Sequence, residues 1–156
     1  MKLVEIFEKL EIPNRDAVIF FHISAEKLKS ITDIKGIFET IENYFDNKST
    51  ICLPSYPFSS SEYFDYISRK PIFDVQNTPC RVNLICEIFR RTNNVIRSIH
   101  PWCSVAAKGE KAYEFVFEHH LSEQVFGEKS PFQKIVRTGG IVVGLGVDCN
   151  TNSFAH

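Results

Sequence analysis

A strand–helix–strand pattern near the start of the chain limits the folds available to it more than any other feature. Residues 17–21 form a continuous apolar run of strand length, which is typical of a strand covered on both faces. Asp33 is a suitable N-cap for the helix that follows. The apolar side chains of that helix repeat at helical spacing: Ile34, Ile37, Phe38, Ile41 and Phe45. Residues 50–53 predict a second strand, so the sequence predicts a βαβ unit with a parallel strand pair.

Further elements are predicted along the rest of the chain. Residues 2–11 predict an amphipathic helix, residues 141–145 a third buried strand and residues 105–107 a short strand. Two more helices are expected, with the following residues on their apolar sides: Leu84, Ile85, Ile88 and Phe89 in one, and Tyr113, Val116, Phe117 and His120 in the other, over residues 110–121. The predicted fold class is α/β, a mainly parallel sheet covered by helices on both faces in three layers.

The segment between residues 54 and 79 is rich in Ser, Tyr, Phe, Asp and Pro and shows no sustained period. A long irregular segment in a compact domain is more often a functional loop than a chance connection. The sequence therefore predicts a functional loop there.

Composition excludes several classes of protein. A chain of 156 residues suits one domain. A net charge of -1 argues against a nucleic-acid partner, because phosphate affinity needs clustered Lys and Arg. The 5 cysteines are odd in number and form no C-x-x-C pair, so neither a zinc site nor a disulfide framework is expected. Charges interrupt the N-terminal apolar run, and no apolar stretch approaches the roughly 18 residues of a membrane span. A cytoplasmic protein without a metal is expected.

The most specific motif lies in residues 97–109, which read Arg-Ser-Ile-His-Pro-Trp-Cys-Ser-Val-Ala-Ala-Lys-Gly. Weaker matches surround it in a fixed order, in residues 21–24, 53–56, 73–79, 130–132 and 144–156. Together these segments resemble the antibiotic (aminoglycoside 3-N-) acetyltransferase family over nearly the whole chain.

The resemblance implies an N-acetyltransferase that moves an acetyl group from acetyl-CoA to the amine of an amino sugar. It implies His156 as the general base and Ser153 as an oxyanion or proton-relay hydroxyl. The residues that it implies for CoA binding are His22, Ser24, Arg97, Ser98, His100, Ser104, Val105 and Ala106. The backbone of residues 104–106 is expected to bond the pantetheine arm like an added strand.

Residues of the 54–79 loop are expected to contact the acceptor through rings and carboxylates: Tyr56, Phe58, Tyr63, Asp65 and Asp74. The resemblance allows two acceptors, an aminoglycoside or a nucleotide-linked amino sugar of surface-polysaccharide synthesis. A polycationic aminoglycoside needs acidic residues, and the loop contains few. That count favours the nucleotide-linked acceptor slightly.

The chain also departs from the family pattern. Family members continue well beyond the position of His156, so the chain is expected to be the N-terminal part of a longer acetyltransferase, nearly inactive alone. Cys103 stands where a second His is common, and Ser153 stands where Thr is usual, which keeps the hydroxyl. Whether the protein forms a homo-oligomer stays open.

Two other functions stay open. The chain is alternatively a non-catalytic remnant that serves as a CoA-binding or interaction module. A third interpretation is an acyltransferase or hydrolase that uses Cys103 with His100, although sequence proximity does not show that the two side chains meet. Structural roles also remain for single residues: Ser24 in a capped loop, His100 at a strand entry and His156 as a frayed end. The pair His119–His120 does not share a helix face, which argues against a metal site.

Overall fold

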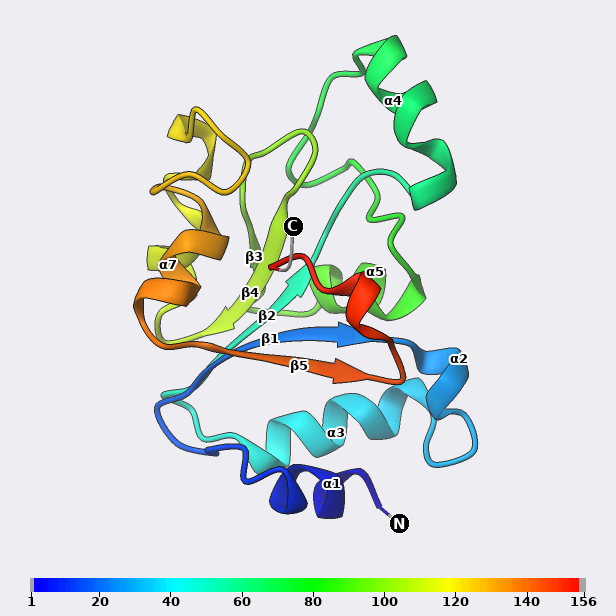
Figure 1. Ribbon diagram of the computed structural model, residues 1–156, viewed down its shortest axis with the longest axis vertical. Coiled ribbons are helices and arrows are strands. Elements are labelled where there is room, and N and C mark those ends of the chain that lie inside the picture. The colour runs from blue at the N-terminus through cyan, green and yellow to red at the C-terminus, as the bar shows by residue number, and fades with distance from the viewer. Residues whose placement is uncertain (1, 155–156) are drawn as a thin grey trace.

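The computed structural model describes residues 2–154, which form a five-stranded mixed sheet with helices packed against it (Figure 1). The strand order is β3-β4-β2-β1-β5. The strands are β1 (Val18–Ile23), β2 (Thr50–Pro54), β3 (Ile96–Arg97), β4 (Val105–Gly109) and β5 (Ile141–Leu145). All four predicted strands are therefore present, and β3 is an addition.

Three strands of the sheet are parallel. β1 pairs in parallel with β2 on one side and with β5 on the other. Helix α3 (Ile34–Tyr44) connects β1 to β2, and the Asp33 carboxylate accepts a hydrogen bond from the Gly36 amide at 2.8 Å. The predicted βαβ unit and its N-cap are confirmed.

The reversed strand β4 makes the sheet mixed rather than mainly parallel. β4 is antiparallel to both β2 and β3. The connection from β3 to β4, residues 98–104, is short, so these two neighbours are antiparallel, because parallel neighbours need a crossover of a dozen or more residues. The periodicity of a short strand does not show its direction.

Helices lie against both faces of the sheet. Their bounds are α1 (Leu3–Lys9), α2 (Ala25–Leu28), α4 (Tyr63–Arg69), α5 (Leu84–Arg91), α6 (Ala112–Val116) and α7 (Pro131–Arg137), with short 3-10 turns η1 (Ser60–Glu62), η2 (His119–Leu121) and η3 (Cys149–Thr151). Alternate β1 residues point to opposite faces, as the period of a strand requires. Phe21 packs with α1, α3 and α5, whereas Phe20 packs with α6 and α7.

The structure differs from the predicted helix over residues 110–121. It contains the shorter α6 followed by η2, and the buried side chains are Ala112, Phe115, Val116 and His119. Tyr113 and Phe117, predicted to face inward, are 62% and 53% exposed and stack on each other at the surface. The helix ends at residue 116, so the turn after it points His119 inward instead of His120.

The predicted 54–79 loop is not structureless. It contains η1 and α4, and α4 extends away from the sheet (Figure 1). None of the α4 residues is buried, so packing against the core does not hold this helix. Within residues 2–154, no helix has the length and apolar character needed to cross a membrane.

Candidate functional site

The carboxyl ends of the parallel strands β1, β2 and β5 meet at one edge of the sheet, here called the carboxyl edge, where α/β proteins commonly bind ligands. Tyr56 follows β2, and Ser153 lies beyond β5 and η3. The Tyr56 hydroxyl and Ser153 Oγ are 2.7 Å apart. The Ser153 amide donates to His22 Nε2, near the end of β1, at 3.3 Å. Three residues that the sequence assigned to three different roles are thus neighbours.

Burial sets the charge states of this group. His22 is buried, and desolvation lowers its pKa to about 4. The ring is therefore neutral near pH 7, with a lone pair on Nε2 for the Ser153 amide. Desolvation also raises the pKa of the Tyr56 phenol and outweighs the opposing effect of its hydrogen bond with Ser153. All three side chains are uncharged near pH 7.

Two polar residues hold the end of β1. Ser24 is the N-cap of α2, and its Oγ accepts from the Lys27 amide at 3.4 Å. Asn83 caps α5 by accepting from the Cys86 amide, and its Nδ2 donates to the Ile23 carbonyl at 2.8 Å. The sequence analysis missed Asn83. Its place before an apolar helix face signals the cap, but no local signal predicts the bond to β1.

The serines of the 97–109 motif hold a buried hairpin together. The Ser98 amide donates to the Val105 carbonyl, and the Val105 amide donates to Ser98 Oγ, both at 2.8 Å. Ser104 Oγ donates to the Ser98 carbonyl at 2.8 Å. Ser98 and Ser104 are fully enclosed, so their hydroxyls serve the hairpin.

Val105 and Ala106 lie in β4, which is an interior strand. Residues 105–109 pair with residues 50–54 on one side, and residues 106–107 pair with residues 96–97 on the other. Residues 105 and 106 are bonded on both sides, which does not favour an added strand there, and a CoA contact of residues 104–106 stays a prediction.

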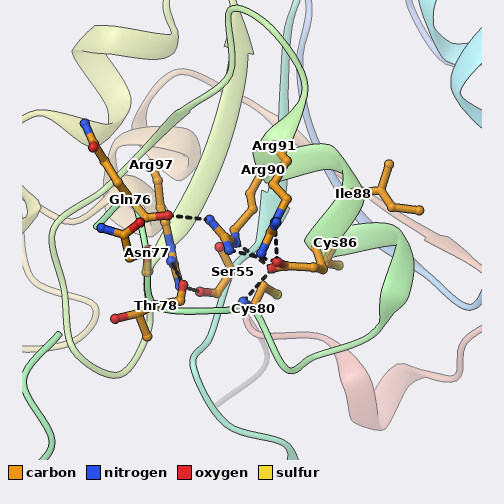
Figure 2. A network of polar contacts seen from close by, with 12 residues as sticks. Ser55, Gln76, Asn77, Thr78, Cys80, Cys86, Ile88, Arg90, Arg91 and Arg97 are labelled. Carbon is orange, nitrogen blue, oxygen red and sulfur yellow. Dashed lines mark hydrogen bonds and ion pairs between the residues drawn. The ribbon is translucent and has the colours of Figure 1, made fainter. Parts of the chain in front are cut away.

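Arg97 fastens the 73–79 segment to the sheet (Figure 2). Its guanidinium donates to the carbonyl oxygens of Ser55 and Thr78, and its Nε donates to Ser104 Oγ at 2.9 Å. Desolvation, followed by the nearby Arg90 charge, lowers the Arg97 pKa to about 10, so the group stays charged near pH 7. The guanidinium is committed to protein atoms here.

A second network in Figure 2 holds the same segment against α5. Arg90 donates to the Gln76 carbonyl at 2.9 Å, and Glu87 accepts from Arg90, from Arg91 and from the Cys80 amide. Two arginines on separate elements therefore fix the conformation of residues 76–80.

His100 has a defined tautomer. Its Nδ1 accepts from the backbone amides of Trp102 and Cys103 at 3.2 and 3.0 Å, so the proton of the neutral ring is on Nε2. The ring stacks on buried His119, whose Nδ1 is 2.8 Å from Ser98 Oγ. Desolvation lowers the pKa of both rings, that of His119 to about 3. The sequence analysis missed His119 because the pair with His120 indicated only a helix end.

The thiol of Cys103 lacks the features of a nucleophile. Burial raises its pKa to about 11, whereas a reactive cysteine has a lowered pKa. His100 Nδ1 already accepts from the Cys103 amide, so that nitrogen is engaged with the backbone. Proximity in sequence does not produce a thiol–imidazole pair at this nitrogen.

Aromatic rings extend from Tyr56 toward α4. The Phe58 ring lies 6.3 Å from that of Tyr56, 5.3 Å from that of Tyr63 and 5.2 Å from that of Tyr66. These distances are within the range of interacting ring pairs. Three of the predicted acceptor contacts, Tyr56, Phe58 and Tyr63, therefore lie in one row of aromatic rings. The fourth ring of this row is Tyr66.

The two predicted acidic contacts have partners within the chain. Asp65 forms an ion pair with Arg69 at 3.0 Å. Asp74 accepts from the amides of Gln76 and Asn77 and closes a turn. Both carboxylates are exposed and retain room for further contacts.

His156, the predicted base, lies outside the described residues. Within residues 2–154, no group of three or more His, Cys, Asp or Glu side chains is arranged to hold a metal ion. A cavity of about 950 Å³ lies between α3, α5 and the sheet, lined by residues such as Phe38, Leu53 and Phe89. None of the predicted site residues lines it.

Known proteins share this fold. The structure of AAC-IIIb in a binary complex with CoASH has a TM-score of 0.82 and 23% identity, and the match covers 99% of this chain and 61% of that one. AAC-VIa bound to sisomicin has a TM-score of 0.80 and 20% identity, and the match covers 99% of this chain and 61% of that one. The YokD protein from Bacillus subtilis has a TM-score of 0.78 and 21% identity, and the match covers 97% of this chain and 66% of that one. This chain thus spans less than two thirds of each relative. A sequence model of aminoglycoside 3-N-acetyltransferases matches residues 20–156, and the chain belongs to that family.

Proposed function

We propose that the protein takes part in acetyl transfer from acetyl-CoA to an amine of an aminoglycoside. Family membership supports this reaction. The observation that carries it is the meeting of His22, Tyr56 and Ser153 at the carboxyl edge, because a hydroxyl in a desolvated environment is suited to stabilising developing charge. AAC-IIIb binds CoASH, which supports acetyl-CoA as the cosubstrate.

Acetyl-CoA supplies the acetyl group as a thioester. The acceptor nitrogen forms a bond to the acetyl carbon, the carbon–sulfur bond breaks, and the sulfur takes up the proton that a base removes from the amine. We assign the base to His156. The Ser153 hydroxyl is the proposed donor to the carbonyl oxygen as negative charge develops there.

The predicted CoA residues divide into two groups. His22, Ser24 and His100 retain polar atoms near the carboxyl edge or the hairpin, and we assign direct contacts to them. The others shape the hairpin through their own bonds: Arg97, Ser98, Ser104, Val105 and Ala106. The uncharged group around Ser153 fits the thioester end of the cosubstrate.

The acceptor is assigned to the α4 side of the carboxyl edge. Phe58 and Tyr63 offer ring faces to a sugar, and Asp65 and Asp74 offer exposed carboxylates to its amines. The binding of sisomicin by AAC-VIa supports an aminoglycoside over a nucleotide-linked amino sugar.

Binding and transfer are measured separately. A ligand that binds only the folded protein raises its stability by about 2.7 kcal/mol at a hundredfold excess over Kd. We expect CoA to raise the thermal midpoint of this chain. Because the chain alone is expected to be nearly inactive, transfer is measured in a protein extended by its natural continuation. There, sisomicin with acetyl-CoA should release free thiol, and both Ser153→Ala and His156→Ala should reduce the release. An unchanged midpoint at millimolar CoA would contradict the proposal. CoA binding without thiol release would instead favour the non-catalytic module.

A further inference from the structure

The Tyr56 hydroxyl lies 2.7 Å from Ser153 Oγ, across 97 positions of sequence. We infer that Tyr56 is a positioning residue: it donates to Ser153 Oγ and thereby directs the Ser153 proton toward the reacting carbonyl oxygen. This inference rests on the proposed function for its target, and it replaces the expectation that Tyr56 contacts the acceptor.

The direction of the hydrogen bond follows from the chemistry of the two hydroxyls. Either atom is able to donate, but a phenol is far more acidic than an aliphatic alcohol and is the better donor. Burial keeps the phenol protonated. Tyr56 therefore donates and Ser153 accepts. An acceptor hydroxyl is polarised by the bond it receives, which strengthens its own O–H as a donor.

The backbone of Ser153 is held independently of its side chain. Its amide donates to His22 Nε2. The next residue, Phe154, packs its ring against Phe20 at 5.0 Å and Phe132 at 5.4 Å. With the backbone fixed and Oγ occupied by Tyr56, the Ser153 proton has few remaining directions.

Tyr56 itself is fixed from the opposite end. Its carbonyl accepts from the Arg81 amide at 2.8 Å, and its ring is packed beside Phe58. Since its phenol oxygen is desolvated and bonded to Ser153, Tyr56 acts on a substrate through Ser153.

The kinetic test uses Tyr56→Phe, Ser153→Ala and the double variant, in a protein that carries out transfer. Tyr113→Phe is the matched control, because it removes the same atom from an exposed ring on α6. Loss of one hydrogen bond predicts a fall in kcat of about tenfold for Tyr56→Phe, with KM for acetyl-CoA unchanged. In the Ser153→Ala background, Tyr56→Phe should have no further effect. Full kcat in Tyr56→Phe would overturn the inference.

A spectroscopic test does not depend on activity. A phenolic proton in a desolvated hydrogen bond exchanges slowly and gives its own proton NMR signal. We expect such a signal from the Tyr56 phenol. The signal should disappear in Tyr56→Phe and persist in Tyr113→Phe. In Ser153→Ala it should be shifted or broadened by exchange. Absence of this signal from the folded protein, or its persistence unchanged in Ser153→Ala, would overturn the inference. The expected signal in a protein that carries its natural continuation and still shows no transfer would support the hydrogen bond and overturn the proposed function alone.

Discussion

The imidazole rings of His100 and His119 stack with their centroids 4.3 Å apart and their planes inclined by 18°. Two histidines stack this closely at little cost only while both are neutral, because protonation of both would place like charges together. The stack ties the exposed turn of the 97–109 motif to the buried η2 turn. The stack also makes the stability of the folded protein depend on pH in the acidic range.

We predict that stability falls as the pH drops below about 6.5. An unfolded histidine has a pKa near 6.5, whereas burial lowers the pKa of His119 to about 3 and of His22 to about 4. Between these values the unfolded chain binds more protons, so stability rises with pH through this window and is lost on acidification. Each unit of pKa difference corresponds to about 1.4 kcal/mol.

Urea unfolding at about pH 7 and pH 5 measures this effect. The midpoint should be lower at pH 5, and His119→Asn should weaken the pH dependence while lowering stability at pH 7. The exposed neighbour provides the control, His120→Asn, which should leave the pH dependence unchanged. Equal midpoints at the two pH values would contradict the prediction.

Gly109 should tolerate no side chain. Its φ is +124°, and an added Cβ would lie 2.0 Å from the Ser49 carbonyl oxygen. Gly109→Ala is expected to cost at least about 3 kcal/mol of unfolding free energy, from backbone strain and the clash together. Gly139→Ala is the matched control: its φ is +69° but nothing lies within 4 Å of the added Cβ, so the cost should be about 1 kcal/mol. Similar urea midpoints for the two variants would contradict this account.

Replacing Arg97 should release the 73–79 segment. Arg97→Met leaves the carbonyls of Ser55 and Thr78 without their donor, at an expected cost of about 3 kcal/mol. Amide exchange in residues 73–79 should accelerate, while Arg91→Met, on a side chain that is 66% exposed, should change it little. A loss of CoA affinity without any change in stability or exchange would instead support the direct CoA contact that the sequence predicted.

Cys103→Ser should retain acetyl transfer. Burial raises the pKa of this thiol to about 11, so it is a poor nucleophile near pH 7. We expect kcat within about twofold of the unmodified protein, by the arithmetic of small barrier changes. Loss of transfer with CoA binding intact, measured by thermal shift, would favour the cysteine-dependent alternative.

The sequence alone determined the elements whose signals are local. Residues 17–21, 50–53 and 141–145 are apolar over a strand length, and each is a strand of the sheet. Asp33 precedes its helix and caps it. The order of the motifs was sufficient to indicate the family that the match over residues 20–156 shows. The strands and the cap depend on neighbours within a few positions, so a linear reading is enough to find them.

Only the tertiary structure decided which residues meet. The contact of Tyr56 with Ser153, the burial of His119 and the interior position of β4 depend on segments far apart in the chain. The same holds for Arg97, whose charge suggested a ligand contact but whose guanidinium binds protein carbonyls. The hydrogen-bonding capacity of a side chain follows from its residue type, which the sequence gives. The partner that satisfies this capacity is set by packing in the folded chain.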